Sequence, residues 1–218
     1  MVDWNERAGG AQARYEDGAA RLPDEVDERQ RQLTRMGNAA WAAGLSFLML
    51  GRREEANQWL VRAAETYRRS WPDAPPGSWG RPIGALKSRL IAGDLVGARD
   101  DARWTLEAGA AGSESPIGRY AAALAHLALA EDDEAAALVP TFEGADAIPL
   151  AVPDALLALA SRDAPRYETA IRALVADFEA REAYLEDTPV ADTVIALQAL
   201  AAERWIVLDL ASPVLPDR

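Results

Sequence analysis

The chain has 218 residues, of which 35 are acidic and 23 basic, so its formal net charge is −12 at neutral pH. This balance argues against DNA or RNA as the main ligand, because affinity for a phosphate backbone needs clustered Lys and Arg. Cysteine is absent, which excludes a disulfide scaffold, cysteine-based metal sites and thiol catalysis. The longest uncharged stretch, residues 36–51, is shorter than the roughly 20 residues of a membrane-spanning helix. With no signal-peptide pattern at the start, we expect a cytoplasmic protein without membrane or nucleic-acid partners.

The basic residues are biased in kind, since 22 are arginine and only Lys87 is lysine. Together with the acidity, this bias is typical of a halophilic protein, in which carboxylates hold a hydration layer at high salt. A GC-rich genome explains the same composition. If the acidity is salt adaptation, the net charge does not indicate a basic partner, and acidic runs such as residues 131–134 are solvated faces.

Read from the N-terminus, the chain divides into helix-length pieces with almost no strand signal. Ala, Leu, Arg and Glu dominate, and alternating apolar and polar runs are missing. Prolines that can open helices are Pro23, Pro82, Pro116 and Pro189, the last two after a hydroxyl residue. Residues 72–80 predict a linker rich in Pro and Gly, and residues 109–113 and 142–149 predict weaker ones. We therefore expect a single all-helical domain over residues 1–218, with nine or ten helices and no sheet.

Residues 36–71 carry a pattern of small and bulky positions that resembles the tetratricopeptide repeat. Its members are Gly44, Phe47, Gly51, Ala56, Leu60 and Ala63. Gly44 and Ala56 would let two antiparallel helices approach closely, and Gly51 would close the first helix in a left-handed conformation. The match is degenerate, because Ala40 stands where the repeat usually carries tryptophan.

Weaker copies of part of this pattern follow along the chain. Leu48, Leu90 and Leu127 are each followed by alanine eight residues later, and a fourth unit begins at Leu157 and is delayed until Ala170. The uneven period predicts antiparallel helical hairpins stacked side by side, a tetratricopeptide-like α-α superhelix. A helical bundle without repeats is the alternative.

The predicted helix over residues 37–50 is apolar nearly all round and must be covered on both sides. Trp41 and Leu45 face either a concave groove or the N-terminal helix, and we favour burial by the N-terminal segment. For a protein partner, the candidate groove face consists of Asn38, Trp41, Leu45 and Trp79. The seven tryptophans are expected mainly in the core, with Trp79 in the linker as the exception.

Catalytic and metal-binding patterns are not found in the sequence. His126 is the only histidine and has no carboxylate three or four positions away, so we expect a packing residue. No nucleophile elbow and no glycine-rich phosphate loop occurs. We therefore predict a protein that is not an enzyme and that has no catalytic residue, cofactor or metal.

The C-terminal segment combines an apolar helix over residues 190–204, a short extended run over residues 205–210, and a Ser-x-x-Leu-Pro-like ending from Ser212 to Pro216. We expect residues 206–210 and 214–216 to pack over the last helix as an apolar lid. In these roughly 30 residues the chain resembles the immunity protein 49 family, although Trp205 stands where a small residue is expected.

The resemblance implies an all-helical intracellular immunity protein that neutralises a toxin of a polymorphic secretion system by covering its active surface. The alternative is a tetratricopeptide-like adaptor that binds a peptide or partner helix in its groove. An enzyme of unrecognised type is a third hypothesis.

Overall fold

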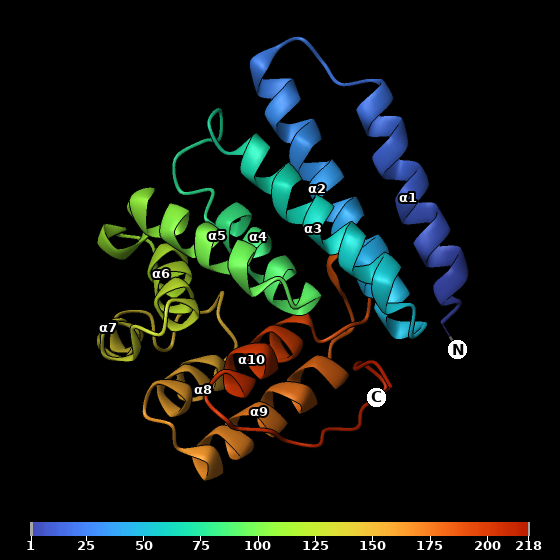
Figure 1. Ribbon diagram of the computed structural model, residues 1–218. Helices are drawn as coiled ribbons and strands as arrows, with labels where there is room; N and C mark the ends of the chain where they lie inside the picture. The colour runs from blue at the N-terminus through green and yellow to red at the C-terminus, as the bar shows by residue number, and fades with distance from the viewer. Residues whose placement is uncertain (1, 218) are drawn as a thin grey trace.

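The computed structural model describes residues 2–217, and within them it contains ten α-helices, three short 3-10 helices and no strand (Figure 1). The prediction of an all-helical fold with nine or ten helices is confirmed. The α-helices are α1 (Trp4–Ala20), α2 (Val26–Met49), α3 (Arg53–Ser70), α4 (Gly80–Ala92), α5 (Leu95–Glu107), α6 (Pro116–Ala128), α7 (Asp132–Leu138), α8 (Ala151–Ala160), α9 (Ala164–Glu179) and α10 (Asp192–Ala202). The 3-10 helices are η1 (Ala110–Gly112), η2 (Val139–Thr141) and η3 (Leu185–Asp187).

The helices form four consecutive antiparallel hairpins, α2/α3, α4/α5, α6/α7 and α8/α9, with α1 packed against α2. Figure 1 shows these hairpins following an arc, with α10 on its inner side. Neighbouring hairpins touch through α3 and α4, α5 and α6, and α7 and α8. The stacked hairpins predicted from the uneven leucine spacing are therefore the architecture of the chain.

Most segment boundaries agree with the sequence prediction. The segments 109–113 and 142–149 lie between α-helices, as does the predicted linker 72–80 except for Gly80, which begins α4. Helix α6 begins at Pro116 directly after Ser115. Pro189 does not open a helix, because α10 begins at Asp192. The backbone before it instead turns through η3, where Glu186 and Asp187 both have positive φ angles.

Close approach between helices depends on two of the glycines in α2 and one in α4. A Cβ atom on Gly44 would lie 2.6 Å from Leu60 Cγ, so α2 and α3 cross where α2 has no side chain. A Cβ atom on Gly37 or Gly84 would lie within 3 Å of the Tyr67 ring, which is therefore held between α2 and α4. Small residues at crossing points thus set the separation between the first three hairpin helices.

Five helices end in the same hydrogen-bonded turn, with one residue in the left-handed region. These residues are Gly51, Gly93, Ala130, Arg162 and Trp205, with φ between +55° and +73°. In each case the left-handed residue donates its N–H to the carbonyl three residues earlier, and the following residue donates to the carbonyl five residues before it. This is the Schellman motif, which satisfies two terminal carbonyls of the helix.

The recurring turn explains the leucine pattern and corrects one part of it. Leu48, Leu90 and Leu127 supply the carbonyls that accept from the left-handed residues of their hairpins. In the fourth hairpin the accepting residue is Leu159, and α9 begins directly after Asp163, so the expected delay until Ala170 does not exist. The position eight residues after Leu159 is Tyr167, which is fully buried.

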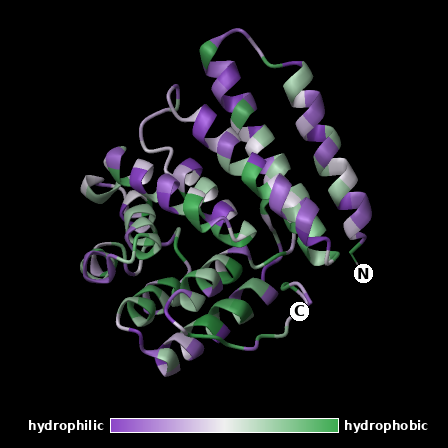
Figure 2. Cartoon of the chain, viewed as in Figure 1, coloured by the Kyte–Doolittle hydropathy of each residue, from purple (hydrophilic) through white to green (hydrophobic). Residues whose placement is uncertain are grey.

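One continuous apolar cluster extends from Ala8 in α1 to Leu215 near the C-terminus. Figure 2 shows that α8 and α10 are apolar over most of their surface, whereas α1 is largely polar. A smaller cluster lies around Trp79 and contains Ala110, Ala121 and Ala122. No helix among residues 2–217 combines the length and the apolar character needed to cross a membrane.

Candidate functional site

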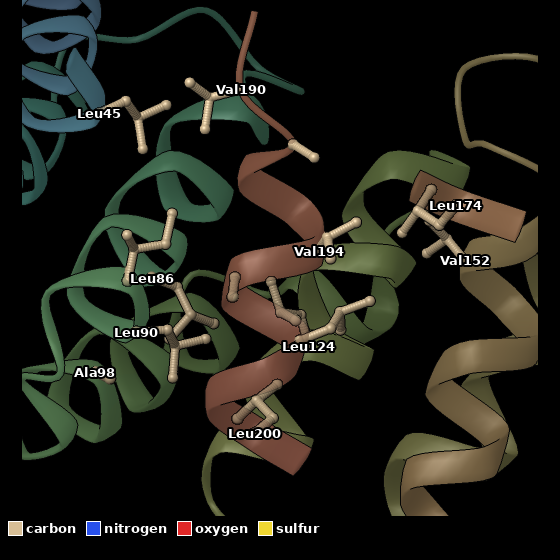
Figure 3. Close-up of a cluster of buried hydrophobic side chains, with 14 of the residues drawn as sticks. Leu45, Leu86, Leu90, Ala98, Leu124, Val152, Leu174, Val190, Val194 and Leu200 are labelled. Atoms are coloured by element: carbon tan, nitrogen blue, oxygen red, sulfur yellow. The ribbon is translucent and has the colours of Figure 1, made fainter. Parts of the chain in front are cut away.

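The groove face predicted on α2 is covered by the C-terminal part of the chain. Leu45 is fully buried and faces Val190 in the segment that leads into α10 (Figure 3). Trp41 is also buried, and it lines a cavity together with Thr188 and Val190. The expectation that the N-terminal segment buries these two side chains is therefore wrong, because the segment before α10 lies against both of them.

Helix α10 occupies the inner side of the arc, where a tetratricopeptide-like adaptor would bind its ligand. It packs against α4, α8 and α9, and Figure 3 shows α4 beside it with Leu86 and Leu90 directed towards it. Val194 and Leu200 of α10 are both buried, and Figure 3 shows Val194 on the side of α10 that faces away from α4. Because α10 is apolar nearly all round, its surface is removed from water only when other helices enclose it on several sides.

The other two candidate residues have structural partners within the chain. Asn38 Oδ1 accepts a hydrogen bond of 2.8 Å from the Tyr67 hydroxyl, so it orients the ring that lies between α2 and α4. Trp79, the expected exception among the tryptophans, is only 7% exposed. Its ring packs against Trp71 with centroids 5.3 Å apart, directly before the start of α4.

A cavity of about 600 Å³ remains open beside the N-terminal end of α10. Aromatic side chains from four parts of the chain line it, namely Trp41, Tyr120, Phe178 and Tyr184. This volume lies within the range of roughly 300–1,000 Å³ that is typical of small-ligand pockets. Of the four candidate residues, Trp41 is therefore the one that the structure places at an open site.

The only lysine of the chain lies in this cavity and is held by the first turn of α10. Lys87 Nζ is 2.5 Å from Asp192 Oδ2 and donates to Thr193 Oγ1 at 2.8 Å. Both members of the ion pair are mostly buried, so their attraction is stronger than that of an exposed pair. The pair links α4 to α10, and it leaves the third N–H of the ammonium group for another acceptor.

Tyr120 is a further polar residue of the cavity. Burial, and secondarily the negative charge of Asp192, raise the pKa of Tyr120 far above its ordinary value. The hydroxyl is neutral at physiological pH, as in any tyrosine, and it can donate a hydrogen bond. With Lys87 and Arg181 it gives the cavity donor groups, which lie among aromatic walls and beside the carboxylates of Asp146, Asp177 and Asp192.

A second and wider opening, of about 960 Å³, lies on the other side of the segment before α10. Arg14 of α1 forms an ion pair of 3.1 Å with Glu186, and Arg7 donates to the carbonyl oxygen of Asp187. These contacts hold the two left-handed residues of η3 against α1. The segment between the two openings is thus fixed from the N-terminal helix.

His126 has a partner that the sequence search at three and four positions missed. Its Nδ1 lies 2.6 Å from Glu131 Oε2, five residues later, across the Schellman turn at Ala130. The contact closes a turn between α6 and α7, so the residue is part of the hairpin. Within residues 2–217 no group of three or more His, Asp or Glu side chains is placed to hold a metal ion.

The structure also exposes an aromatic residue that the sequence analysis placed in the core. Trp205 is 91% exposed, and Val207, two residues later, is 76% exposed. Ile206 between them is buried, as are Leu210, Val214 and Leu215. The expected apolar lid therefore forms, but Trp205 and Val207 point away from it.

Comparisons of this chain with family models, with curated proteins and with solved structures found no match.

Proposed function

We propose that this chain is a non-catalytic protein-binding protein that neutralises a toxin by covering part of its surface. The likeness of the last 30 residues to the immunity protein 49 family supplies the class of partner. The occupation of the inner side of the arc by α10 is the observation that carries the proposal.

The position of α10 favours a toxin inhibitor over an adaptor. An adaptor of the tetratricopeptide type presents an empty groove to a peptide or a partner helix. Here Leu45, Val190 and Val194 fill that space from within one chain. The result is a body in which α10 ties α4 to α8 and α9. Such a body binds through its outer surface, where about 800 Å² per partner suffices for a specific complex.

One observation favours the adaptor alternative. The cavity beside Trp41 is open, and it has room for one or two side chains of a peptide, with Lys87 and Tyr120 as hydrogen-bond donors. A peptide bound there would enter side chain first and would not lie along the groove.

Co-expression tests the toxin proposal directly. The chain is expressed in a bacterial host together with each product of the neighbouring reading frames, and cell survival is measured. We expect one product to be toxic alone and harmless with the chain, and the two purified proteins to form a complex in about 1 M KCl, where non-specific ionic contacts are screened. Survival that does not depend on the chain would contradict the proposal.

Two matched substitutions distinguish the inhibitor from the adaptor. Ala147 is exposed at the cavity, and Ala111 is exposed on η1 away from it. Ala147→Trp closes the cavity, so it should abolish binding by an adaptor and leave a toxin inhibitor that uses its outer surface unchanged. Ala111→Trp should have no effect on binding in either case.

A further inference from the structure

Three side chains that carry hydrogen-bond donors line the cavity beside α10, one from the first helix of each of the first three hairpins. They are Trp41 of α2, Lys87 of α4 and Tyr120 of α6. Helix α4 contacts α6, and both α4 and α8 contact α10, so first helices form the inner side of the arc. Because α10 fills only part of this side, the three residues border the space that it leaves. We call them the donor side of the cavity.

Two of these donors have no acceptor within the protein. Trp41 is 5% exposed and Tyr120 is 8% exposed. Neither the indole N–H nor the hydroxyl group forms a hydrogen bond within the part of the chain that the structure describes. Lys87 uses one N–H for Asp192 and another for Thr193, so its third N–H is also available. Since polar groups on buried side chains are normally hydrogen-bonded, three available donors in one cavity indicate a place for an acceptor from outside the chain.

The polar groups next to the donor side are already occupied. Asp192 accepts from Lys87 with one oxygen atom and from the Thr193 N–H with the other. The hydroxyl groups of Tyr184 and Thr188 donate to nearby backbone carbonyl oxygens. The groups that remain available on this side are therefore donors, and a ligand that binds there must supply the acceptor atom.

The charges that line the cavity form two ion pairs and leave one exposed carboxylate. Lys87 lies 2.5 Å from Asp192, and Arg181 lies 2.6 Å from Asp177. The fifth charged residue, Asp146, is exposed to solvent, where salt screens its charge. An anionic ligand group on the donor side would lie beside Asp192 as well as beside Lys87. Since burial of a charge is unfavourable unless the charge is paired, an uncharged acceptor is the group that this side favours.

The rest of the cavity is mainly apolar and is formed before a ligand binds. Its apolar walls include Ile83, Ile117, Ile148, Val152 and Phe178. One wall is the segment before α10, which the ion pair of Arg14 with Glu186 holds against α1. A volume of about 600 Å³ is far larger than a single polar group needs, so the ligand that fits has an apolar body as well.

We propose that this cavity binds a small, uncharged organic molecule with an apolar body and a carbonyl oxygen, as in an amide, a ketone or an ester. The carbonyl oxygen has two lone pairs, which accept hydrogen bonds from the donor side. The apolar body packs between the aromatic and aliphatic walls. The site goes beyond toxin binding and does not rest on it, because the toxin is expected at the outer surface.

Three probe molecules that share a phenylpropyl body test the class of ligand. They are 3-phenylpropanamide, 3-phenylpropanoate and 3-phenylpropylammonium, and isothermal titration calorimetry measures their binding to the full-length chain at neutral pH. We expect the amide to bind at least about tenfold tighter than either ion, because only the amide offers an acceptor without a charge to desolvate. Tightest binding of the carboxylate or of the ammonium ion would overturn the proposal in favour of a charged ligand. Failure of the amide to bind up to its solubility limit would overturn it outright.

Tyr120→Phe tests the donor side. The variant removes a hydroxyl group that has no partner in the protein, so the melting temperature should not fall. The affinity for 3-phenylpropanamide should fall about fivefold or more, as for the loss of one hydrogen bond. Tyr15→Phe makes the same change on α1, outside the cavity, and should leave the affinity unchanged. Equal affinities of the wild type and Tyr120→Phe would contradict the assigned donors.

Ala147→Trp, which closes the cavity, locates the bound amide even if Tyr120→Phe proves too unstable to measure. It should abolish binding of 3-phenylpropanamide, whereas Ala111→Trp on η1 should leave binding unchanged. Amide binding that survives Ala147→Trp would place the ligand elsewhere and overturn the proposal. A peptide with a central glutamine that binds at least about tenfold tighter than the free amide would overturn it in favour of the adaptor.

Discussion

The turn after α4 and the turn after α10 have the same backbone conformation, but the left-handed residue has no side chain in the first turn and a tryptophan side chain in the second. Gly93 and Trp205 both lie in the left-handed region, and each closes a Schellman motif with the same two hydrogen bonds. After Gly93 the chain enters α5 with Asp94 as the N-cap, whereas after Trp205 it continues as an extended lid. Glycine at the first turn is what the backbone favours.

The comparison shows that the turn can form without glycine when neighbouring contacts hold it. At Trp205 the buried side chains of Arg204 and Ile206 maintain the conformation. At Gly93 no heavy atom lies within 4 Å of the position that a Cβ atom would take, so no packing determines the residue there. The left-handed backbone conformation is unfavourable in free energy for any residue with a Cβ atom. Such a residue is tolerated at the turn only where tertiary contacts of its neighbours offset that free energy.

Removal of the contact that holds the Trp205 turn should have the largest effect. Arg204→Met leaves Asp132 without its closest partner, and we expect a loss of about 3 kcal/mol in the free energy of unfolding, as for broken buried pairs. Chemical denaturation measures it. Arg99→Met breaks an exposed pair on the same end of α10 and should cost less than about 1 kcal/mol. Equal losses in the two variants would show that burial of Arg204 does not hold the turn.

The Gly93 turn should respond to a single methyl group. Gly93→Ala introduces no steric clash, so the expected loss of about 1 kcal/mol reflects the left-handed backbone alone. Thermal unfolding checks it. Gly9 lies inside α1 with equally open surroundings, and Gly9→Ala should instead stabilise the chain by about 0.5 kcal/mol. A stabilised Gly93→Ala would contradict the assigned strain.

The reverse substitution, alanine to glycine, tests the same left-handed position in the α6/α7 hairpin. Ala130 is exposed and left-handed, so Ala130→Gly should raise the free energy of unfolding by about 0.5 kcal/mol. Ala176 is exposed inside α9, and Ala176→Gly should lower it by about 1 kcal/mol. The two alanine-to-glycine changes are thus expected to differ in sign, and chemical denaturation of both at one pH decides it.

The smallest expected effect is on the pH dependence of stability, and it comes from Asp94, the residue after Gly93. Burial alone would raise the pKa of Asp94, but its bonds to the Gly97 N–H and to Arg89 hold it below the ordinary value. The folded state therefore gains stability from this carboxylate above the ordinary pKa and loses it as the pH falls through the lowered one. Asp94→Asn keeps the cap and removes the titration. Between about pH 5 and about pH 2, the wild type should lose about 0.5 kcal/mol more than this variant.

Much of the architecture could be predicted because its determinants are local. The close crossing at Gly44, the turn at Gly51 and the start of α6 at Pro116 depend on residues within one hairpin. The fourth hairpin was harder to place, since Arg162 carries no composition signal for a left-handed residue.

The candidate site was only partly predictable. Trp41 lies at an open cavity as a groove residue would, but Leu45 and Trp79 are buried by segments distant in the sequence. Lys87 and Asp192 are 105 positions apart, and no local pattern relates them. The apolar surface of α10 shows that it must be enclosed but not by which helices.

The sequence by itself determined that the chain forms helical hairpins and where most of them turn, because capping, glycine conformation and small crossing residues act over a few positions. Tertiary structure alone decided that α10 fills the inner side of the arc and that Trp205 faces solvent. Both outcomes depend on which apolar surfaces meet. The hydrophobic effect is not directional, so an apolar surface in the sequence does not indicate which other surface will cover it.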